Sequence, residues 1–197
     1  SSGLKVGSAS DNAAYWSIST TMKTESSSLS VVGEALGMGS SLADISNTAT
    51  QSLIDLMGKV RDRVVAAGES TNDKDKIQTE LAQLYTQMTN TVDAASFNGQ
   101  NWLTAIDKEG NDLEASTNVL SGVTSGKLNF IAVSLEAEDQ NTSEVVGTIT
   151  ALDRDDLDDD ALAATLAKVD AAIKGLTSIG ASFGAASARI DIQKDFI

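Results

Sequence analysis

The stretch LSVVGEALGMGSSLADISNTATQSLIDLMGKVRDRVV, residues 29–65, sets the architecture of this chain. Apolar or small residues recur in it at spacings of three and four, which is typical of helices packed along a shared seam. The seam consists of Leu29, Val32, Leu36, Gly39, Leu42, Ile45, Ala49, Leu53, Leu56, Val60 and Val64. Because the chain contains no proline, the pattern predicts a helix reaching back to Asp11, about 55 residues and about 80 Å long.

Two further helices are expected to pack against this long one. The first follows Ser70-Thr71-Asn72, with Thr71 or Asn72 as its N-cap, and folds back antiparallel to about Ala95. The second runs from about Asp158 to the last residue and carries its own seam at spacings of four and three. None of these helices can bury its seam alone. The predicted fold is therefore mainly α, an elongated antiparallel helical bundle of a long helix, a fold-back helix and a C-terminal helix.

The segment 105–157 interrupts the helical pattern. Turn-forming residues are frequent in it, and two runs, KLNFIAVSL (127–135) and VVGTIT (145–150), are rich in residues that favour strands. We therefore expect a small β-rich insert at 105–157, between the two parts of a helical rod domain, 1–104 and 158–197. Both chain ends should lie at one end of the rod and the insert at the other.

The composition excludes several classes of function. The absence of Cys and His removes thiolate nucleophiles, the commonest metal ligand and the usual general base. A net charge of −14 argues against nucleic acid and anionic membrane surfaces as partners. We expect no enzyme activity, no cofactor and no metal. The acidic run Asp153 to Asp160 suggests a calcium site only weakly, since it lacks the EF-hand spacing, and an acidic linker is the simpler interpretation.

Several short motifs occur together in the two parts of the predicted helical rod, 1–104 and 158–197. They are SSGLKV (1–6), SASDNAA (8–14), IQTEL (77–81), FNG (97–99) followed by Trp102-Leu103, and the segment 184–192 containing Arg189. As a set they resemble bacterial flagellin, the flagellar filament subunit, and the AYWSI form at 14–18 is similar to an alphaproteobacterial branch. The first residues fall inside the N-terminal signature and the last seam is still running at Ile197. A fragment truncated at both termini is therefore expected.

The resemblance implies a function and a set of partners. Flagellins leave the cell through the flagellar type III export apparatus without a cleaved signal peptide, assemble beneath a cap and polymerise into an extracellular helical propeller for motility. The main partner implied is the chain itself. Because the terminal polymerisation segments are expected to be missing, this chain should be a soluble monomer. The alternatives are a hook-associated junction protein, or a cell-surface flagellin-like protein that binds a polysaccharide through the insert, where Trp102 and Phe130 are the nearby aromatic residues.

A contact face for other subunits or for a receptor is also implied. Its candidate residues are Asp11, Asn12, Lys59, Arg61, Asp62, Arg63, Glu80, Asn98 and Arg189. From the residues alone, the charges at 59–63 fit either a contact face or ordinary surface ion pairs. In flagellins, the innate receptor toll-like receptor 5 binds a helix segment that maps onto 57–64. Arg61 and Glu80 match its pattern, and Asp62 is a shortened match for Glu. Gly58 replaces Gln and Arg63 replaces Leu, so weak or absent receptor activation is expected.

Overall fold

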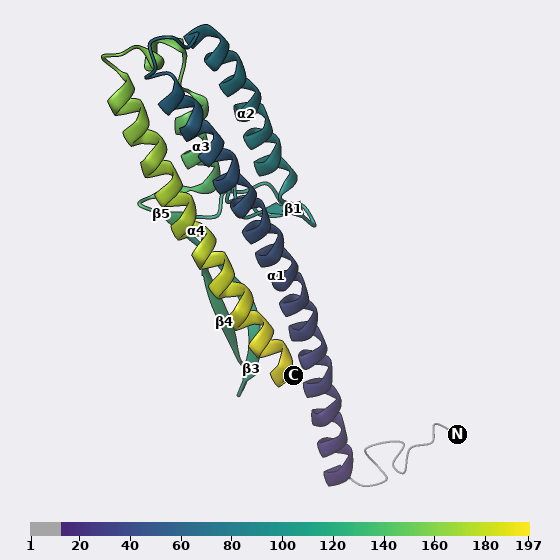
Figure 1. Cartoon of the computed structure of the whole chain (residues 1–197). Coiled ribbons are helices and arrows are strands. Elements are labelled where there is room, and N and C mark those ends of the chain that lie inside the picture. Colours follow the sequence, from purple (N-terminus) through teal and green to yellow (C-terminus); the bar gives the residue numbers. More distant parts are fainter. Residues whose placement is uncertain (1–12) are drawn as a thin grey trace.

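The computed structural model describes residues 13–197, which form an elongated helical bundle with small strand pairs along one side (Figure 1). The elements in chain order are α1 (Ala13–Ala66), α2 (Lys74–Ala94), β1 (Ser96–Phe97), β2 (Gln100–Asn101), β3 (Ser116–Thr124), β4 (Lys127–Ser134), β5 (Glu136–Ala137), β6 (Gln140–Asn141), α3 (Thr142–Thr150), η1 (Arg154–Leu157) and α4 (Leu162–Phe196). The predicted mainly α bundle is confirmed. Within the described residues, every helix is too short or too polar to cross a membrane.

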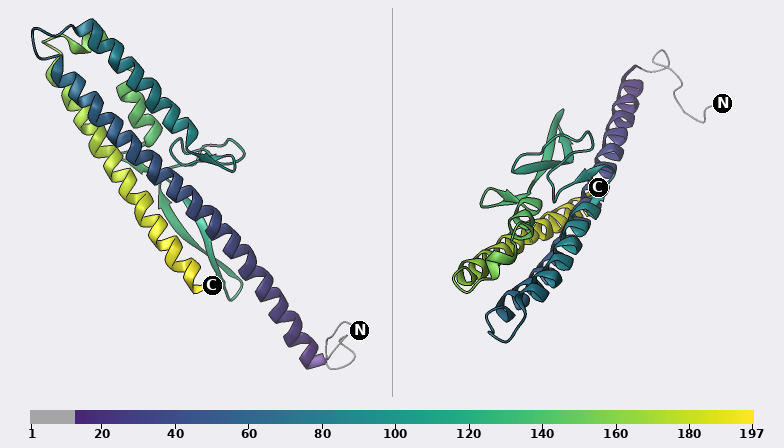
Figure 2. Two further views of the ribbon diagram at one scale, coloured as in Figure 1. Left: turned by 45° about the vertical axis from the view of Figure 1, so that its right-hand side comes forward. Right: turned by 90° about the horizontal axis from the view of Figure 1, so that it is seen from above.

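Helix α1 is uninterrupted over 54 residues. α1 packs chiefly against α4, and Val32, Leu36, Leu53 and Val60 of its seam are fully buried. Leu29 belongs to the predicted seam but is exposed. The reason is geometric, because α1 runs on past the C-terminal end of α4 (Figures 1 and 2).

Helix α2 folds back beside α1 as predicted, but its N-cap is Asp73 and not Thr71 or Asn72. The Asp73 carboxylate accepts hydrogen bonds from the backbone N–H groups of Asp75 and Lys76. Its negative charge also interacts favourably with the positive end of the helix dipole, which a hydroxyl or amide cannot match. Asn72 instead donates through its side-chain amide to the carbonyl of Ala66, at 2.8 Å, and so closes the end of α1.

Helix α4 begins at Leu162, later than the predicted start near Asp158. The acidic run before it forms the short helix η1, closed by a reciprocal capping box between Asp153 and Asp156. The Thr165 hydroxyl then donates to the Asp156 carbonyl at 2.6 Å, which holds η1 against the first turns of α4. Local caps therefore form η1 and delay the start of α4, in a region where the sequence pattern alone predicts the beginning of a single helix.

The middle segment contains one of the two predicted strand runs. Residues 127–134 form β4, which pairs antiparallel with β3. The run VVGTIT is wrong as a strand, because it lies in helix α3. Asn141 accepts from the N–H of Glu144 at 2.9 Å, and the Glu144 carboxylate accepts from the N–H of Asn141 at 2.8 Å. This capping box starts a helix in spite of the β-branched residues that follow.

The β3–β4 hairpin does not lie at the far end of the rod, so that prediction is wrong. It lies along α1 and α4 and points toward the end where the described chain begins and ends (Figure 1). Val119 packs over Gly39, where an added Cβ would come within 2.6 Å of the Val119 Cγ1 atom. Arg189 donates to the carbonyl of Ala132 at 2.7 Å, and Gln193 to that of Ser121 at 2.8 Å. The far end holds the α1–α2 turn and η1 instead.

Candidate functional site

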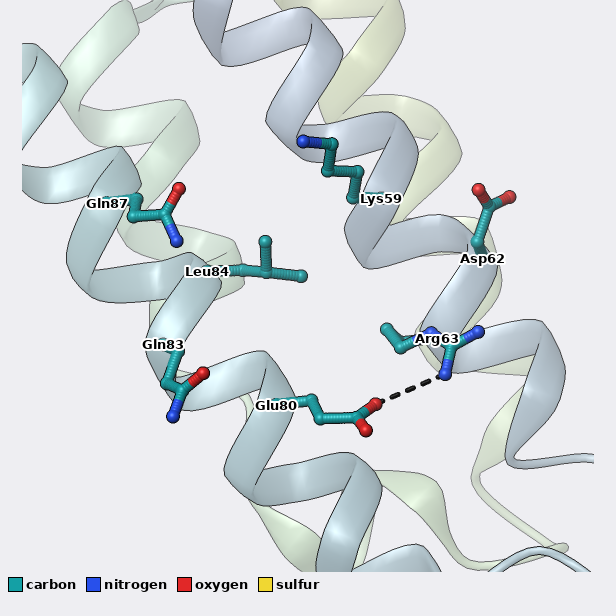
Figure 3. Close-up of a pocket in the computed structure, with 7 residues that line it drawn as sticks. All are labelled: Lys59, Asp62, Arg63, Glu80, Gln83, Leu84 and Gln87. Atoms are coloured by element: carbon teal, nitrogen blue, oxygen red, sulfur yellow. Dashed lines mark hydrogen bonds and ion pairs between the residues drawn. The ribbon is translucent and has the colours of Figure 1, made fainter.

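An open groove of about 410 Å³ lies between α1 and α2, toward the end of the rod where the two helices are joined. Helical spacing aligns its residues, at i, i+3 and i+4 on α1 and at i, i+3, i+4 and i+7 on α2. They are Lys59, Asp62, Arg63, Glu80, Gln83, Leu84 and Gln87 (Figure 3). Four of the predicted contact residues therefore share one surface. Its charged and amide groups surround one leucine, a mixture suited to another protein surface.

One ion pair crosses this groove. Arg63 donates through Nη1 to the Glu80 Oε2 atom at 3.2 Å (Figure 3). Both side chains are partly exposed, so the pair contributes about 0.2–1 kcal/mol to stability. It nevertheless fixes the Glu80 carboxylate toward α1, where a binding partner would have to compete with Arg63 for it.

Arg61 lies on a different side of α1, facing α4. Its Nε donates to the Asp170 carboxylate at 2.7 Å. This hydrogen bond, together with the charge of Asp170, raises the pKa of Arg61 above its ordinary value. Arg61 therefore joins the two longest helices and does not line the groove with Lys59, Asp62 and Arg63.

The remaining predicted contact residues are dispersed. Asn98 occupies the β1–β2 turn with φ 52°, followed by Gly99 with φ 79°, as the Asn-Gly turn signal predicts. Arg189 is on α4, where it holds the β3–β4 hairpin. Asp11 and Asn12 lie outside the described residues. A single face that includes all nine candidates is therefore not formed within residues 13–197.

Gln83, Leu84 and Gln87 were missing from the sequence-based contact face. The signal for them was present in the chain, since they follow Glu80 at i+3, i+4 and i+7 on the same side of a predicted helix. The partner of Arg61 could not be read in this way, because Asp170 is 109 residues further along the chain.

Two basic side chains form ion pairs with the acidic run at 153–160, so this run is not a free linker. Arg154 donates to Asp75 at 2.7 Å and to Asp158 at 2.9 Å, and Lys74 donates to Asp159 at 2.7 Å. The hydrogen bond from Lys74 lowers the pKa of Asp159. Across the described part of the chain, no group of three or more His, Cys, Asp or Glu side chains is placed to hold a metal ion.

Two other residues, a possible sugar-binding tryptophan and a possible glycosylation site, are buried in the structure. Trp102 is buried and stacks on Phe183, with ring centroids 6.2 Å apart, so it offers no platform to a sugar. Asn141, in the sequon Asn-Thr-Ser, is buried and caps α3, which makes it a poor glycosylation acceptor.

Comparison with known proteins places these features in a family. Residues 1–108 match the family described as the bacterial flagellin N-terminal helical region. Flagellin A of Rhizobium meliloti is 51% identical over 105 residues, 53% of this chain and 27% of the relative. The flagellin of Brucella melitensis biotype 1 is 31% identical over 199 residues, 100% of this chain and 69% of the relative.

A solved structure and the relative lengths complete the comparison. The fold resembles the crystal structure of Bacillus cereus flagellin, with a TM-score of 0.65 and 18% identity over 82% of this chain and 87% of that chain. The match covers about a quarter of the length of the Rhizobium relatives. The alphaproteobacterial resemblance is confirmed, and the chain belongs to the bacterial flagellin family.

Proposed function

We propose that this chain forms the rod of a flagellar filament subunit, and that copies associate through heterologous contacts that repeat without closing. The observation that carries the proposal is an uncovered apolar surface where α1 runs past α4. Met22 on α1 is 64% exposed and Phe196 on α4 is 83% exposed. Ile18, one turn from Met22 on α1, and Ile192, one turn from Phe196 on α4, are also exposed. Clustered exposed apolar side chains usually mark a protein contact, and neighbouring subunits would cover those of each helix.

The shape of the molecule supports the same function. An unbroken helix of about 80 Å gives a stiff strut, and flagellins are a structural family. We expect the extracellular flagellum as the location, reached by the flagellar type III export route, with addition beneath the filament cap. The division into a rod, 1–104 with 158–197, and a variable insert, 105–157, stays a prediction.

The test is complementation. The full-length gene that encodes this chain would be expressed in a rhizobial strain whose own flagellin genes are deleted, and the cells would be examined by electron microscopy with gold-labelled antibody against the chain. We expect long labelled filaments. Short labelled rings at the hook would indicate a junction protein instead. Bare cells, in a strain that a Rhizobium meliloti flagellin gene restores, would overturn the proposal.

We also propose that recognition by toll-like receptor 5 is weak. Two observations favour this: Glu80 is paired with Arg63, which stands where the family pattern has Leu, and Arg61 is paired with Asp170. A cell reporter assay on filaments depolymerised to subunits tests it. Activation at the potency of an ordinary flagellin would contradict the proposal.

A further inference from the structure

The dipeptide Asn-Gly occurs once in the chain, at Asn98-Gly99, and forms the exposed turn between β1 and β2. Asn98 has φ 52° and Gly99 has φ 79°, as a type I′ hairpin turn requires. Because Gly99 has no side chain, its backbone nitrogen is open to close approach. The side chain of Asn98 therefore meets little steric hindrance on its way to the next nitrogen of the backbone.

The Asn98 carboxamide is weakly held in the folded chain. Its Nδ2 atom lies 3.7 Å from the Met38 Sδ atom, and a thioether sulfur is a weak acceptor. By contrast, Asn72 and Asn101 each donate to a backbone carbonyl at 2.8 Å, and Asn141 caps α3. Those three side chains are fixed in other directions, whereas the Asn98 carboxamide can turn toward the backbone.

The other asparagines among residues 13–197 are restrained or obstructed. Asn111 and Asn129 donate to side-chain oxygens, at 3.2 Å and 2.8 Å. Three more lie within regular helices or strands, and each precedes a β-branched residue whose side chain obstructs its own backbone nitrogen. They are Asn47, Asn90 and Asn118. Within the described chain, a weakly held carboxamide and an unobstructed neighbour thus occur together only in the β1–β2 turn.

The β1–β2 hairpin is short enough to open locally. Its strands are joined by two residue pairs, and a two-stranded hairpin is marginally stable by itself. Within residues 13–197, no backbone carbonyl accepts a hydrogen bond from the Gly99 N–H. A ring between the Asn98 side chain and this nitrogen requires the turn to change its backbone angles. Local opening makes that change accessible while the bundle stays folded.

We propose that Asn98 is a site of spontaneous deamidation. The Gly99 backbone nitrogen attacks the Asn98 Cγ atom, a C–N bond forms, and the side-chain nitrogen leaves as ammonia with the proton that the backbone nitrogen loses. The product is a five-membered succinimide ring. Water then adds to one of the two ring carbonyl carbons and breaks the C–N bond there, which gives aspartate or isoaspartate. The reaction needs only the folded chain and water, so the inference does not rest on the proposed function.

The structure also indicates what the modification changes. Isoaspartate runs the main chain through the side-chain carbon and lengthens the turn by one atom, which a two-residue turn matched to its strands cannot absorb. We expect loss of the β1–β2 pairing and of the amide contacts from Asn98 and Gln100 to the Met38 sulfur. Asn101 limits the change, because its Nδ2 atom donates to the Val92 carbonyl at 2.8 Å. The bundle should keep its helices.

Peptide mapping tests the proposal. Soluble subunits of the full-length protein would be incubated at neutral and at mildly alkaline pH and digested with trypsin at intervals, with an unincubated sample as background. Cleavage after Lys76 and Lys108 releases one peptide that contains Asn90, Asn98 and Asn101. We expect a mass gain of about 1 Da, located at Asn98 by fragmentation, partly as isoaspartate and faster at the higher pH. Asn90, exposed on α2, and Asn101, buried, are internal controls and should keep their amides.

Two variants and an unfolded sample make the test specific. Asn98→Gln should abolish the mass gain, because glutamine would have to close a six-membered ring, which is much slower. Asn90→Gln is the matched control and should leave the gain unchanged. A parallel incubation in urea gives the rate in the unfolded chain, and circular dichroism checks that the other samples are folded.

The inference is wrong if Asn98 in the folded chain changes no faster than Asn90, or if it changes only in urea, since the turn would then protect it. Filament formation does not enter this experiment. A failure of the proposed function would therefore leave the result at Asn98 unaffected, and intact Asn98 would leave the proposed function unaffected.

Discussion

The Tyr85 hydroxyl is buried and has no hydrogen-bond partner among residues 13–197. Burial, with a contribution from the charge of Asp156, raises the pKa of Tyr85 to about 12. The folded state therefore favours the neutral phenol more strongly than the unfolded state does. The stability that results is fully present below pH 10, the ordinary tyrosine pKa, and is lost as pH rises toward 12.

Tyr85→Phe should therefore flatten the loss of stability between about pH 10 and 12. At pH 7 the substitution should be neutral or slightly stabilising, because it removes a buried hydroxyl that lacks a partner. Urea unfolding at pH 7, 10 and 11.5 measures both effects. A variant whose alkaline unfolding follows that of the parent chain would show that Tyr85 is not the group responsible.

Gly39 allows a close contact between α1 and Val119 of the hairpin. A Cβ there would lie 2.6 Å from one Val119 methyl and 3.0 Å from the other. Gly39→Ala should destabilise the chain by about 1–3 kcal/mol through overpacking. Gly33→Ala is the matched control, since within the described residues no atom outside its own helix neighbourhood lies within 4 Å. That control should gain about 0.5–1 kcal/mol from helix propensity. Equal effects in thermal unfolding would refute the contact.

At the level of elements, the helices could be predicted because their seams repeat over many turns. Local caps defeated the prediction in three places: Asp73 set the start of α2, η1 delayed α4, and Asn141 turned VVGTIT into α3. The position of the hairpin was also missed, because Val119 packing on Gly39 is a contact between residues 80 positions apart. In the candidate site, the sequence predicted the charged contact residues of α1, but it did not predict that Asp170 is the partner of Arg61.

The start of α3 gives a prediction about caps. Asn141→Ala removes the acceptor for the N–H of Glu144 and should cost about 1 kcal/mol of folding free energy. Glu144→Gln keeps an acceptor for the N–H of Asn141 and should cost much less. Denaturant unfolding compares the two. Equal losses would mean that the negative charge of Glu144 contributes as much to α3 as the Asn141 cap does.

For the whole molecule, charge opposes assembly while apolar surface favours it. Each chain carries a net charge of −14, so copies brought side by side repel one another over distances that salt screens, about 10 Å at 0.1 M. Apolar contacts, which salt does not screen, supply the attraction that must overcome this repulsion.

Raising NaCl from about 0.01 M to about 0.15 M, over which the Debye length falls from about 30 Å to about 8 Å, should therefore lower the subunit concentration at which filaments form. Sedimentation of filaments regrown from depolymerised subunits measures this concentration. Lys127→Glu makes the net charge more negative by two, so it should raise this concentration, with the largest difference from the parent chain at the lowest salt. A critical concentration that rises with salt would show that attraction between unlike charges, and not apolar contact, drives assembly.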